Sequence, residues 1–178
     1  MNIYFITPFP ESIKILIENN ISNQGIKKKL IDVNIVNLRD FSDNEYKKID
    51  DEPYGGGSGM VMMAEPLFKA IDYCIKKCID KPKIIFPSPK GKILDHSTSE
   101  SLSKEGSLIF ICGHYKGIDQ RVIDKYVDLE VSIGDYIISN GELSSMIIFD
   151  SIARLVPGVL NDLNSAMTDS FVDDLLDA

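Results

Sequence analysis

The chain has 178 residues, about the length of one domain, with 44% hydrophobic and 26% charged residues, as in an ordinary globular protein. No apolar run approaches the roughly 20 residues that span a membrane, and no basic flank precedes the first apolar run, so we expect a cytoplasmic protein without a membrane partner. The net charge of −8 argues against broad binding of polyanions such as DNA, because such binding draws on Lys and Arg at phosphates.

The first half of the chain predicts a strand, a helix, a second strand and a long loop. Residues 2–6, NIYFI, have the pattern of a buried strand, and the helix after them begins near Pro10 with an apolar stripe from Ile13 to Ile21. The second strand is predicted at 33–38. Residues 39–60 are polar, charged and then glycine-rich, which predicts a loop longer than the usual connection of about 4 to 6 residues and therefore a functional candidate.

The second half alternates helices and strands, which predicts an α/β fold with a parallel-rich sheet flanked by helices. Short, nearly continuous apolar runs are typical of parallel strands that are covered on both faces. We predict an amphipathic helix at 65–79, a strand at 83–86, a short capped helix at 95–106 and a strand at 107–112. A helix from about 119, a strand at about 127–132 and an amphipathic helix from 141, stopped by Pro157 and Gly158, are predicted to follow.

The three cysteines do not indicate a disulfide framework or a zinc site. Their number is odd, and Cys74 and Cys78 lie four residues apart on a predicted helix, so we expect buried, reduced thiols. A zinc site needs more ligands at fixed spacing, whereas the two histidines, His96 and His114, are far apart in the sequence. We therefore predict no metal site from these residues.

The glycine-rich stretch GGGSGM at 55–60 resembles a phosphate loop only superficially. A Walker A motif needs Lys and Ser or Thr where Met60 and Val61 stand, and a Rossmann fingerprint needs a preceding strand and a third glycine at the right offset. What remains is either a backbone that a ligand approaches closely in positive-φ conformations, or a flexible spacer. The stretch alone does not decide between them.

Two further loops have the same character. In FICGHYKGIDQRV, residues 110–122, Gly113 and Gly117 follow a buried strand, and the carboxyl ends of such strands are where open α/β folds bind ligands. The same residues also fit a tight turn in which Asp119 caps the next helix. In SIGDYIISNGELSS, residues 132–145, Gly134 and Gly141 bracket an apolar segment. Three such loops together favour one ligand site.

The chain resembles the bacterial tRNA (guanine-N1)-methyltransferase family, TrmD. The resemblance rests on DDEPYGGGSGMVMMAEPL, ICGHYKGIDQRVID, SIGDYIISNGELSSMIIFDSIARLVPGVL and DSFVDDLLD, which occur in the family's order over essentially the whole chain. It implies a SPOUT-class α/β fold with a deep trefoil knot in its C-terminal half, an obligate homodimer, and S-adenosylmethionine held bent in the knot. Knots are rare, and neither periodicity nor composition predicts one.

The reaction that the resemblance implies is transfer of a methyl group from S-adenosylmethionine to N1 of guanosine 37, in tRNAs with a G at position 36. N1 of neutral guanine carries a proton, so a base is needed. By motif match the base is Asp169, supplied by the subunit opposite the bound donor, and Arg154 holds O6, where negative charge develops. From the residues alone, Arg154 reads as a surface arginine at a helix end and Asp169 as one Asp of an acidic tail.

The resemblance also implies the binding residues. The glycines of the first loop, Gly55, Gly56, Gly57 and Gly59, are expected beside the target guanosine, which has to leave its stack. The family binds the donor largely through backbone groups of three loops, and the matching positions here are Phe86, Pro87, Ser88, Pro89, Gly113, Tyr115, Ile133, Gly134, Tyr136, Ile138 and Gly141.

Four positions, His114, Lys116, Asn140 and Ser144, depart from the family. The loop Gly-Arg-Tyr-Glu-Gly reads Gly-His-Tyr-Lys-Gly here, so Lys116 reverses a charge beside the cationic donor; if the family's carboxylate holds the donor, its affinity falls, and otherwise little changes. Asn140 replaces the first of two glycines, and Ser144 replaces a proline. Because Asn tolerates a left-handed backbone, we expect the turn at Asn140 to survive.

The end of the sequence raises an alternative. We expect residues 1–160 to form the knotted catalytic domain. Residues 161–178 are expected to be a linker at the start of a basic, tRNA-binding domain that the chain otherwise lacks. We expect residues after Gly158 to be mobile in the absence of tRNA. Such a chain would dimerise and bind S-adenosylmethionine but methylate tRNA weakly. The alternative function is therefore a catalytically silent, donor-binding dimer. The family also uses Mg²⁺, for which the sequence offers no ligand cluster.

Overall fold

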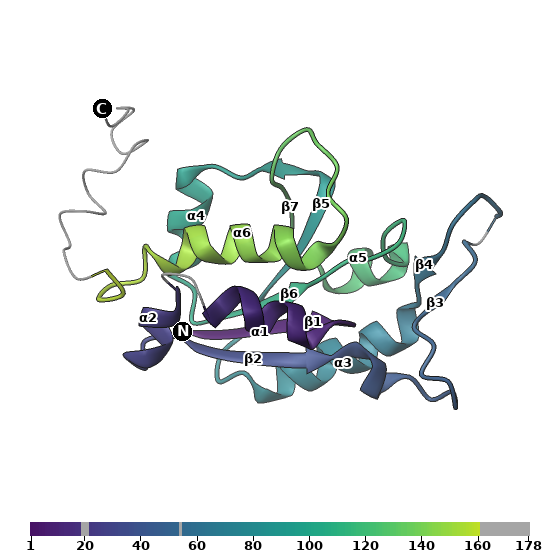
Figure 1. Ribbon diagram of the computed structural model, residues 1–178, viewed down its shortest axis with the longest axis horizontal. Coiled ribbons are helices and arrows are strands. Elements are labelled where there is room, and N and C mark those ends of the chain that lie inside the picture. The colour runs from purple at the N-terminus through teal and green to yellow at the C-terminus, as the bar shows by residue number, and fades with distance from the viewer. Residues whose placement is uncertain (19–21, 54, 161–178) are drawn as a thin grey trace.

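The computed structural model describes residues 1–18, 22–53 and 55–160, and a parallel five-stranded sheet forms its centre (Figure 1). The strand order is β2-β1-β6-β5-β7, and each neighbouring pair is parallel. The strands of this sheet are β1 (Asn2–Thr7), β2 (Asp32–Asn37), β5 (Lys83–Ile93), β6 (Ser107–Ile111) and β7 (Leu129–Ser132). A short antiparallel hairpin of β3 (Asp50–Asp51) and β4 (Val61–Met62) stands at the end of the molecule away from the N-terminus.

In the part of the chain that the structure describes, six α-helices cover the two faces of the sheet. They are α1 (Pro10–Glu18), α2 (Ser22–Lys27), α3 (Ala64–Lys77), α4 (His96–Ser103), α5 (Gln120–Tyr126) and α6 (Gly141–Ala153), with a 3-10 helix η1 (Leu38–Phe41) after β2. Helices α1 and α6 contact each other on one face (Figure 1). The described residues include no helix both long enough and apolar enough to cross a membrane.

Alternating side chains of each central strand feed two separate cores. Ile3 and Phe5 of β1 pack with α1, α2, α4 and α6, whereas Tyr4 and Ile6 pack with α3 and α5. In the first core the ring of Phe5 stacks on Phe110 of β6, with ring centres 5.0 Å apart. Burial on both faces explains why these strands read as continuous apolar runs.

The predicted α/β fold with a parallel sheet flanked by helices is confirmed. The strands and helices predicted from apolar patterns are present within a few residues of their predicted bounds, although the stripe residue Ile21 and the acidic segment 161–178 lie outside the described residues. The trefoil knot stays a prediction.

Four features were not predicted, one of which is the 3-10 helix η1. Strand β5 continues past residue 86 to Ile93, and β7 pairs with both of its ends around an irregular stretch between Pro87 and Lys92. Helix α2 and the hairpin β3–β4 were also missed, the hairpin because it lies inside the predicted loop at 39–60.

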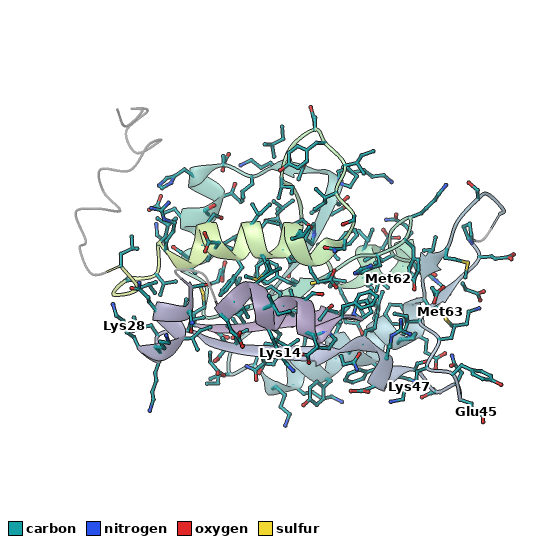
Figure 2. The ribbon with its side chains drawn as sticks, in the orientation of Figure 1. Lys14, Lys28, Glu45, Lys47, Met62 and Met63 are labelled. Carbon is teal, nitrogen blue, oxygen red and sulfur yellow. The ribbon has the colours of Figure 1, made fainter. Side chains whose placement is uncertain are left out.

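Near α2, the Lys28 ammonium donates to the carbonyls of Gly158 and Val159 at 2.9 and 3.1 Å, which ties the last described segment to the domain (Figure 2).

Candidate functional site

A cavity of about 300 Å³ opens where the irregular stretch of β5 and the loops after β6 and β7 meet. This volume is at the lower end of the range for small-molecule sites, about 300 to 1,000 Å³. The structure brings all eleven predicted donor-binding residues into its wall: Phe86, Pro87, Ser88, Pro89, Gly113, Tyr115, Ile133, Gly134, Tyr136, Ile138 and Gly141. The wall also contains residues that were not predicted as ligands, among them His114, Lys116, Asn140 and Ser144.

The contact between the loop after β6 and the start of α6 forms the floor of this cavity. The Gly141 N–H donates to the Gly113 carbonyl at 2.9 Å, and a Cβ on Gly141 would lie 2.4 Å from the Gly113 nitrogen. The Phe86 ring also packs closely on Gly113, because a Cβ there would lie 2.8 Å from Phe86 Cε2. These positions therefore admit only glycine without movement of the wall.

The loop after β6 is held in a strained conformation. Tyr115 has φ of 59°, in the left-handed region that costs a non-glycine residue about 1–2 kcal/mol. The loop is tied to the segment around β4: Lys116 N–H donates to the Met60 carbonyl and Met62 N–H to the Gly117 carbonyl, both at 3.0 Å. Met62, labelled in Figure 2, is fully buried, and its sulfur accepts the His114 N–H at 3.1 Å.

The loop between β7 and α6, whose course Figure 1 shows, lines the cavity. Gly134 has φ of 130° and lies under the Tyr136 ring, so it provides a tight turn at the cavity wall. Asn140 does not use the left-handed conformation that we expected of it. Its backbone is extended, with φ of −156°, and its side chain caps α6 by accepting the Leu143 N–H at 3.1 Å. The turn survives because Asn140 is a helix cap.

A buried polar network lies behind the cavity wall and was not predicted. Glu142 is 1% exposed, and its two oxygens contact the Thr7 hydroxyl and His114 Nε2, the latter at 2.6 Å. Thr7 in turn accepts the Phe9 N–H at 2.9 Å. The available sequence signals were the acidic residue in the first turn of α6 and the histidine in place of the family's arginine.

The glycine-rich loop joins β3 to β4 and adopts the conformations that its composition allows. Its four glycines have positive φ, namely 99° at Gly55, 85° at Gly56, 121° at Gly57 and 99° at Gly59. None of them lines the cavity. The loop nevertheless meets the cavity wall through Lys116, whose ammonium donates to Ser58 at 3.1 Å and whose stem would lie 2.8 Å from a Cβ on Gly59.

Of the two predicted catalytic residues, Asp169 lies outside the described residues and Arg154 is not in the cavity wall. Arg154 is the C-cap of α6, whereas Gly141 at the cavity is the first residue of this helix, so the two are about 20 Å apart along the axis at 1.5 Å per residue. One turn before Arg154, burial raises the pKa of the Asp150 carboxyl and the charge of Arg154 opposes this shift. Asp150 Oδ1 is buried without a hydrogen-bond partner among the described residues.

The cysteine thiols are the next candidates for chemistry among the described residues. Cys112, fully buried at the end of β6, donates to Ser145 at 3.4 Å, and burial raises the pKa of its thiol well above the usual range. Cys74 and Cys78 are also free thiols. In the ranges 1–18, 22–53 and 55–160, no three His, Cys, Asp or Glu side chains cluster as they would around a metal ion.

Comparisons with known proteins agree on one family. The family model for "tRNA (Guanine-1)-methyltransferase TrmD" matches residues 1–178. A tRNA (guanine-N(1)-)-methyltransferase of Clostridioides difficile is 43% identical over 178 residues, which are 99% of this chain and 77% of that protein. The enzyme of the same name from Buchnera aphidicola of Acyrthosiphon pisum is 49% identical over 173 residues, 97% of this chain and 73% of that one.

The fold leads to the same family. The crystal structure of tRNA (m1G37) methyltransferase from Aquifex aeolicus superimposes with a TM-score of 0.83 at 38% sequence identity, covering 91% of this chain and 72% of that one. Sequence and structure thus agree over nearly the whole chain, and the chain belongs to the tRNA (guanine-1)-methyltransferase family TrmD.

Proposed function

We propose that this chain is the tRNA (guanine-N1)-methyltransferase that its family implies, and that it methylates N1 of guanosine 37 with S-adenosylmethionine as the donor. The observation that carries the proposal is the cavity at the ends of β6 and β7, whose wall contains all eleven residues assigned to the donor from sequence motifs. These residues come from three segments between positions 86 and 141, so the match depends on the fold as well as on the motifs.

The cavity suits S-adenosylmethionine in size and in chemistry. Its wall contains proline, glycine, isoleucine and aromatic residues beside a few polar side chains, which favours an adenine ring against apolar side chains with hydrogen bonds to backbone groups. When bound, the donor supplies a methyl group on a positively charged sulfonium. In this proposal Phe86 and the loops at 113–117 and 133–141 hold the donor and keep water away from it.

The base and the electrostatic partner come from the C-terminal part of the chain. Asp169 takes the proton from guanine N1, and Arg154 stabilises the negative charge that develops on O6. Both assignments rest on the family motifs. Arg154 lies about 20 Å along α6 from Gly141, so it is far from the cavity of its own chain.

A second copy of the chain resolves this separation. One face of α6 carries Leu143, Ile147, Asp150 and Arg154 at the spacing of helix turns, and Leu143 and Ile147 are exposed although they are large and apolar. If two α6 helices pack antiparallel across this face around a two-fold axis, Arg154 of each chain comes to the cavity end of the other. We therefore propose a homodimer with its active sites at the interface, in which a partner group also satisfies the buried oxygen of Asp150.

The glycine-rich loop provides the tRNA side of the site. Its positive-φ glycines leave the backbone bare, and Lys116 connects it to the wall of the donor cavity. A flipped guanine could therefore lie between the loop and the donor without meeting side chains of the loop. Residues 1–160 would form the catalytic domain, and 161–178 would lead towards tRNA-binding elements. Mg²⁺ is a proposed participant that this chain does not hold through a cluster among its described residues.

Two measurements test the proposal. Calorimetry with S-adenosylmethionine measures donor binding, and methyl transfer to a tRNA transcript with unmodified guanosine 37 measures turnover, with a transcript carrying adenosine 37 as the control. Binding together with transfer to the first transcript alone supports the methyltransferase. Binding without transfer to either supports the silent donor-binding dimer, and absence of binding contradicts both. Addition of a chelator to the transfer assay tests the role of Mg²⁺.

A further inference from the structure

We propose that His114 is a positioning residue for the donor site, anchored by Glu142, and that it holds Tyr115 in its left-handed conformation at the cavity wall. The proposal rests on the proposed function for what the wall binds, and on the buried network for how the wall is held. Three distant segments meet in this network: the end of β1 with Thr7, the loop after β6 with His114, and the first turn of α6 with Glu142.

The network has a defined direction of hydrogen bonding. Thr7 Oγ1 accepts the Phe9 N–H at 2.9 Å, which leaves the hydroxyl proton for one oxygen of Glu142. The other oxygen lies 2.6 Å from His114 Nε2. An ionised carboxylate accepts only, so Nε2 is the donor to it. Glu142 is 1% exposed and lies in the first turn of α6, where the helix dipole favours a negative charge.

His114 is the member of the network that reaches the cavity. Its side chain is 13% exposed, and it lines the cavity next to Tyr115. Its ring packs on that of Phe9, with centres 4.9 Å apart, so the imidazole is held from two sides. A residue with the φ of Tyr115 needs such fixed neighbours, because an unrestrained loop would relax to negative φ.

The restraints on Tyr115 come from both sides in the sequence. On the far side, Lys116 N–H is bound to the Met60 carbonyl, and the Gly117 carbonyl accepts from Met62. Three hydrogen bonds hold the residues that precede Tyr115. The Gly113 carbonyl accepts from the Gly141 N–H, and the His114 N–H donates to the Met62 sulfur. The His114 side chain contacts Glu142. The pair His114–Glu142 is thus the side-chain link between the Tyr115 turn and α6.

The test compares variants that keep or remove the hydrogen bond at this position. His114→Asn shortens the side chain so that it cannot reach Glu142, whereas His114→Gln keeps a neutral N–H donor of nearly the same reach. His96→Gln, in the other histidine of the chain, is the matched control, because His96 lies at the start of α4 and outside the cavity wall. The readouts are amide hydrogen exchange over residues 112–118 in the free protein, the Kd of S-adenosylmethionine, and, with tRNA as the acceptor, kcat and the KM for S-adenosylmethionine.

We expect His114→Asn to accelerate exchange at residues 115–117 and to raise the Kd and KM for the donor by about tenfold to a hundredfold, the value of one hydrogen bond to a charged group, with a smaller change in kcat. His114→Gln should recover most of this loss, and His96→Gln should match the wild type. Wild-type exchange rates and donor affinity in His114→Asn would overturn the proposal. An equal loss of donor affinity in His114→Asn and His114→Gln would also overturn it.

The same experiment separates this inference from the proposed function. Failure of the wild-type chain to bind S-adenosylmethionine would contradict the proposed function. Hydrogen exchange is measured without donor or tRNA, so it would still decide whether His114 holds the turn. Glu142→Ala provides a second route if His114→Asn does not fold. It removes both oxygens that contact Thr7 and His114, and it should accelerate exchange in the same peptide. Exchange at wild-type rates in Glu142→Ala would overturn the anchoring role.

Discussion

The Gly141 N–H donates to the Gly113 carbonyl at 2.9 Å, at the point where the start of α6 touches the loop after β6. The two backbones are so close that a Cβ on Gly141 would lie 2.4 and 2.6 Å from the nitrogen and oxygen of Gly113. This contact forms the floor of the cavity. The relative position of the loop and the helix, and with it the width of the cavity, is therefore set by backbone contact.

Substitution of Gly141 by Ala should damage the donor site and the fold together. The added methyl group has to displace the loop or the helix, and overpacking of this kind costs about 1–3 kcal/mol of unfolding free energy. We expect urea unfolding to show this loss and calorimetry to show weaker binding of S-adenosylmethionine. Ser151→Ala, on the same helix with its hydroxyl bonded to the Ile148 carbonyl, is the control and should keep donor affinity. Wild-type donor affinity in Gly141→Ala would contradict the proposed site.

The dimer proposal predicts a separation of folding from activity. Ile147 is 46% exposed on the α6 face that we assign to the interface, and Ile147→Asp should leave the monomer folded but block association. An unpaired charge buried at an interface costs several kcal/mol, so tRNA methylation should fall by about a hundredfold or more. Sedimentation checks the mass, and circular dichroism checks the fold.

The control for Ile147→Asp is Ile79→Asp. Ile79 is 93% exposed and lies beyond the end of α3, which packs on the opposite face of the sheet. This variant should remain dimeric and active. A dimeric, active Ile147→Asp would require another interface and another source for the residues that the donor cavity lacks.

The sequence predicted those strands and helices whose positions depend on burial on both faces or on a residue that starts a helix. Strands β1 and β6 are buried on both faces, so their apolar runs identified them, and Pro10 and Asp119 identified helix starts. The second half of β5 was missed because PSPKGKI carries two prolines and a glycine, which read as a turn. It is a strand because β7 pairs with both of its ends.

The candidate site was predictable from the sequence only in part. Glycine-rich loops after buried strands indicated a ligand, but only the family resemblance named the ligand and the residues. The Thr7–Glu142 contact joins positions 135 residues apart, and no local pattern reports such a contact. Asn140 was expected to tolerate a left-handed turn, but it caps α6 in an extended conformation, since its side-chain oxygen lies within reach of the Leu143 N–H.

Buried thiols should make the protein sensitive to alkaline pH. Burial on α3 raises the pKa of Cys74 from 9.0 to about 12, with a smaller contribution from Cys78. The unfolded chain then releases its proton first, so the stabilising effect is complete below pH 9 and is lost as pH rises from 9 to about 12.

Between these two pKa values, stability should fall by about 1.4 kcal/mol per pH unit for this thiol. Urea unfolding at several pH values measures the slope, and Cys74→Ala should reduce it even though the substitution lowers stability overall. Cys78→Ala, at a half-buried thiol, should reduce it less. Equal slopes in wild type and Cys74→Ala would contradict the assignment.

The charge of Lys116 should weaken donor binding. Lys116 lines the cavity, is exposed and donates to Ser58, and the sulfonium of the donor is also positive. Lys116→Glu restores the residue usual in the family and replaces a repulsion by an attraction. With each charge interaction worth about 1 kcal/mol or less in water, we expect an increase of about threefold to tenfold in donor affinity, which shrinks as salt is added.

Lys81→Glu makes the same charge change at an exposed position just before β5, away from the cavity. It should leave the affinity for S-adenosylmethionine unchanged, so calorimetry of the two variants at low and high salt separates a local effect from one of net charge. Equal effects of both substitutions would show that Lys116 acts only through net charge. Weaker binding by Lys116→Glu would show that the ammonium itself holds the donor.

The glycine-rich loop should affect tRNA turnover more than donor binding. Gly59 has φ of 99°, and a Cβ on it would lie 2.8 Å from Lys116 Cε, so Gly59→Ala carries backbone strain of about 1–2 kcal/mol and also pushes on the cavity wall. Gly56 has φ of 85° with no atom within 4 Å of an added Cβ, so Gly56→Ala carries the strain alone.

We expect Gly59→Ala to reduce methylation of tRNA by at least about tenfold, and Gly56→Ala to reduce it less, with near-normal donor Kd in both. Steady-state kinetics on the guanosine 37 transcript and calorimetry measure the two effects, and full turnover by Gly59→Ala would leave the loop a spacer.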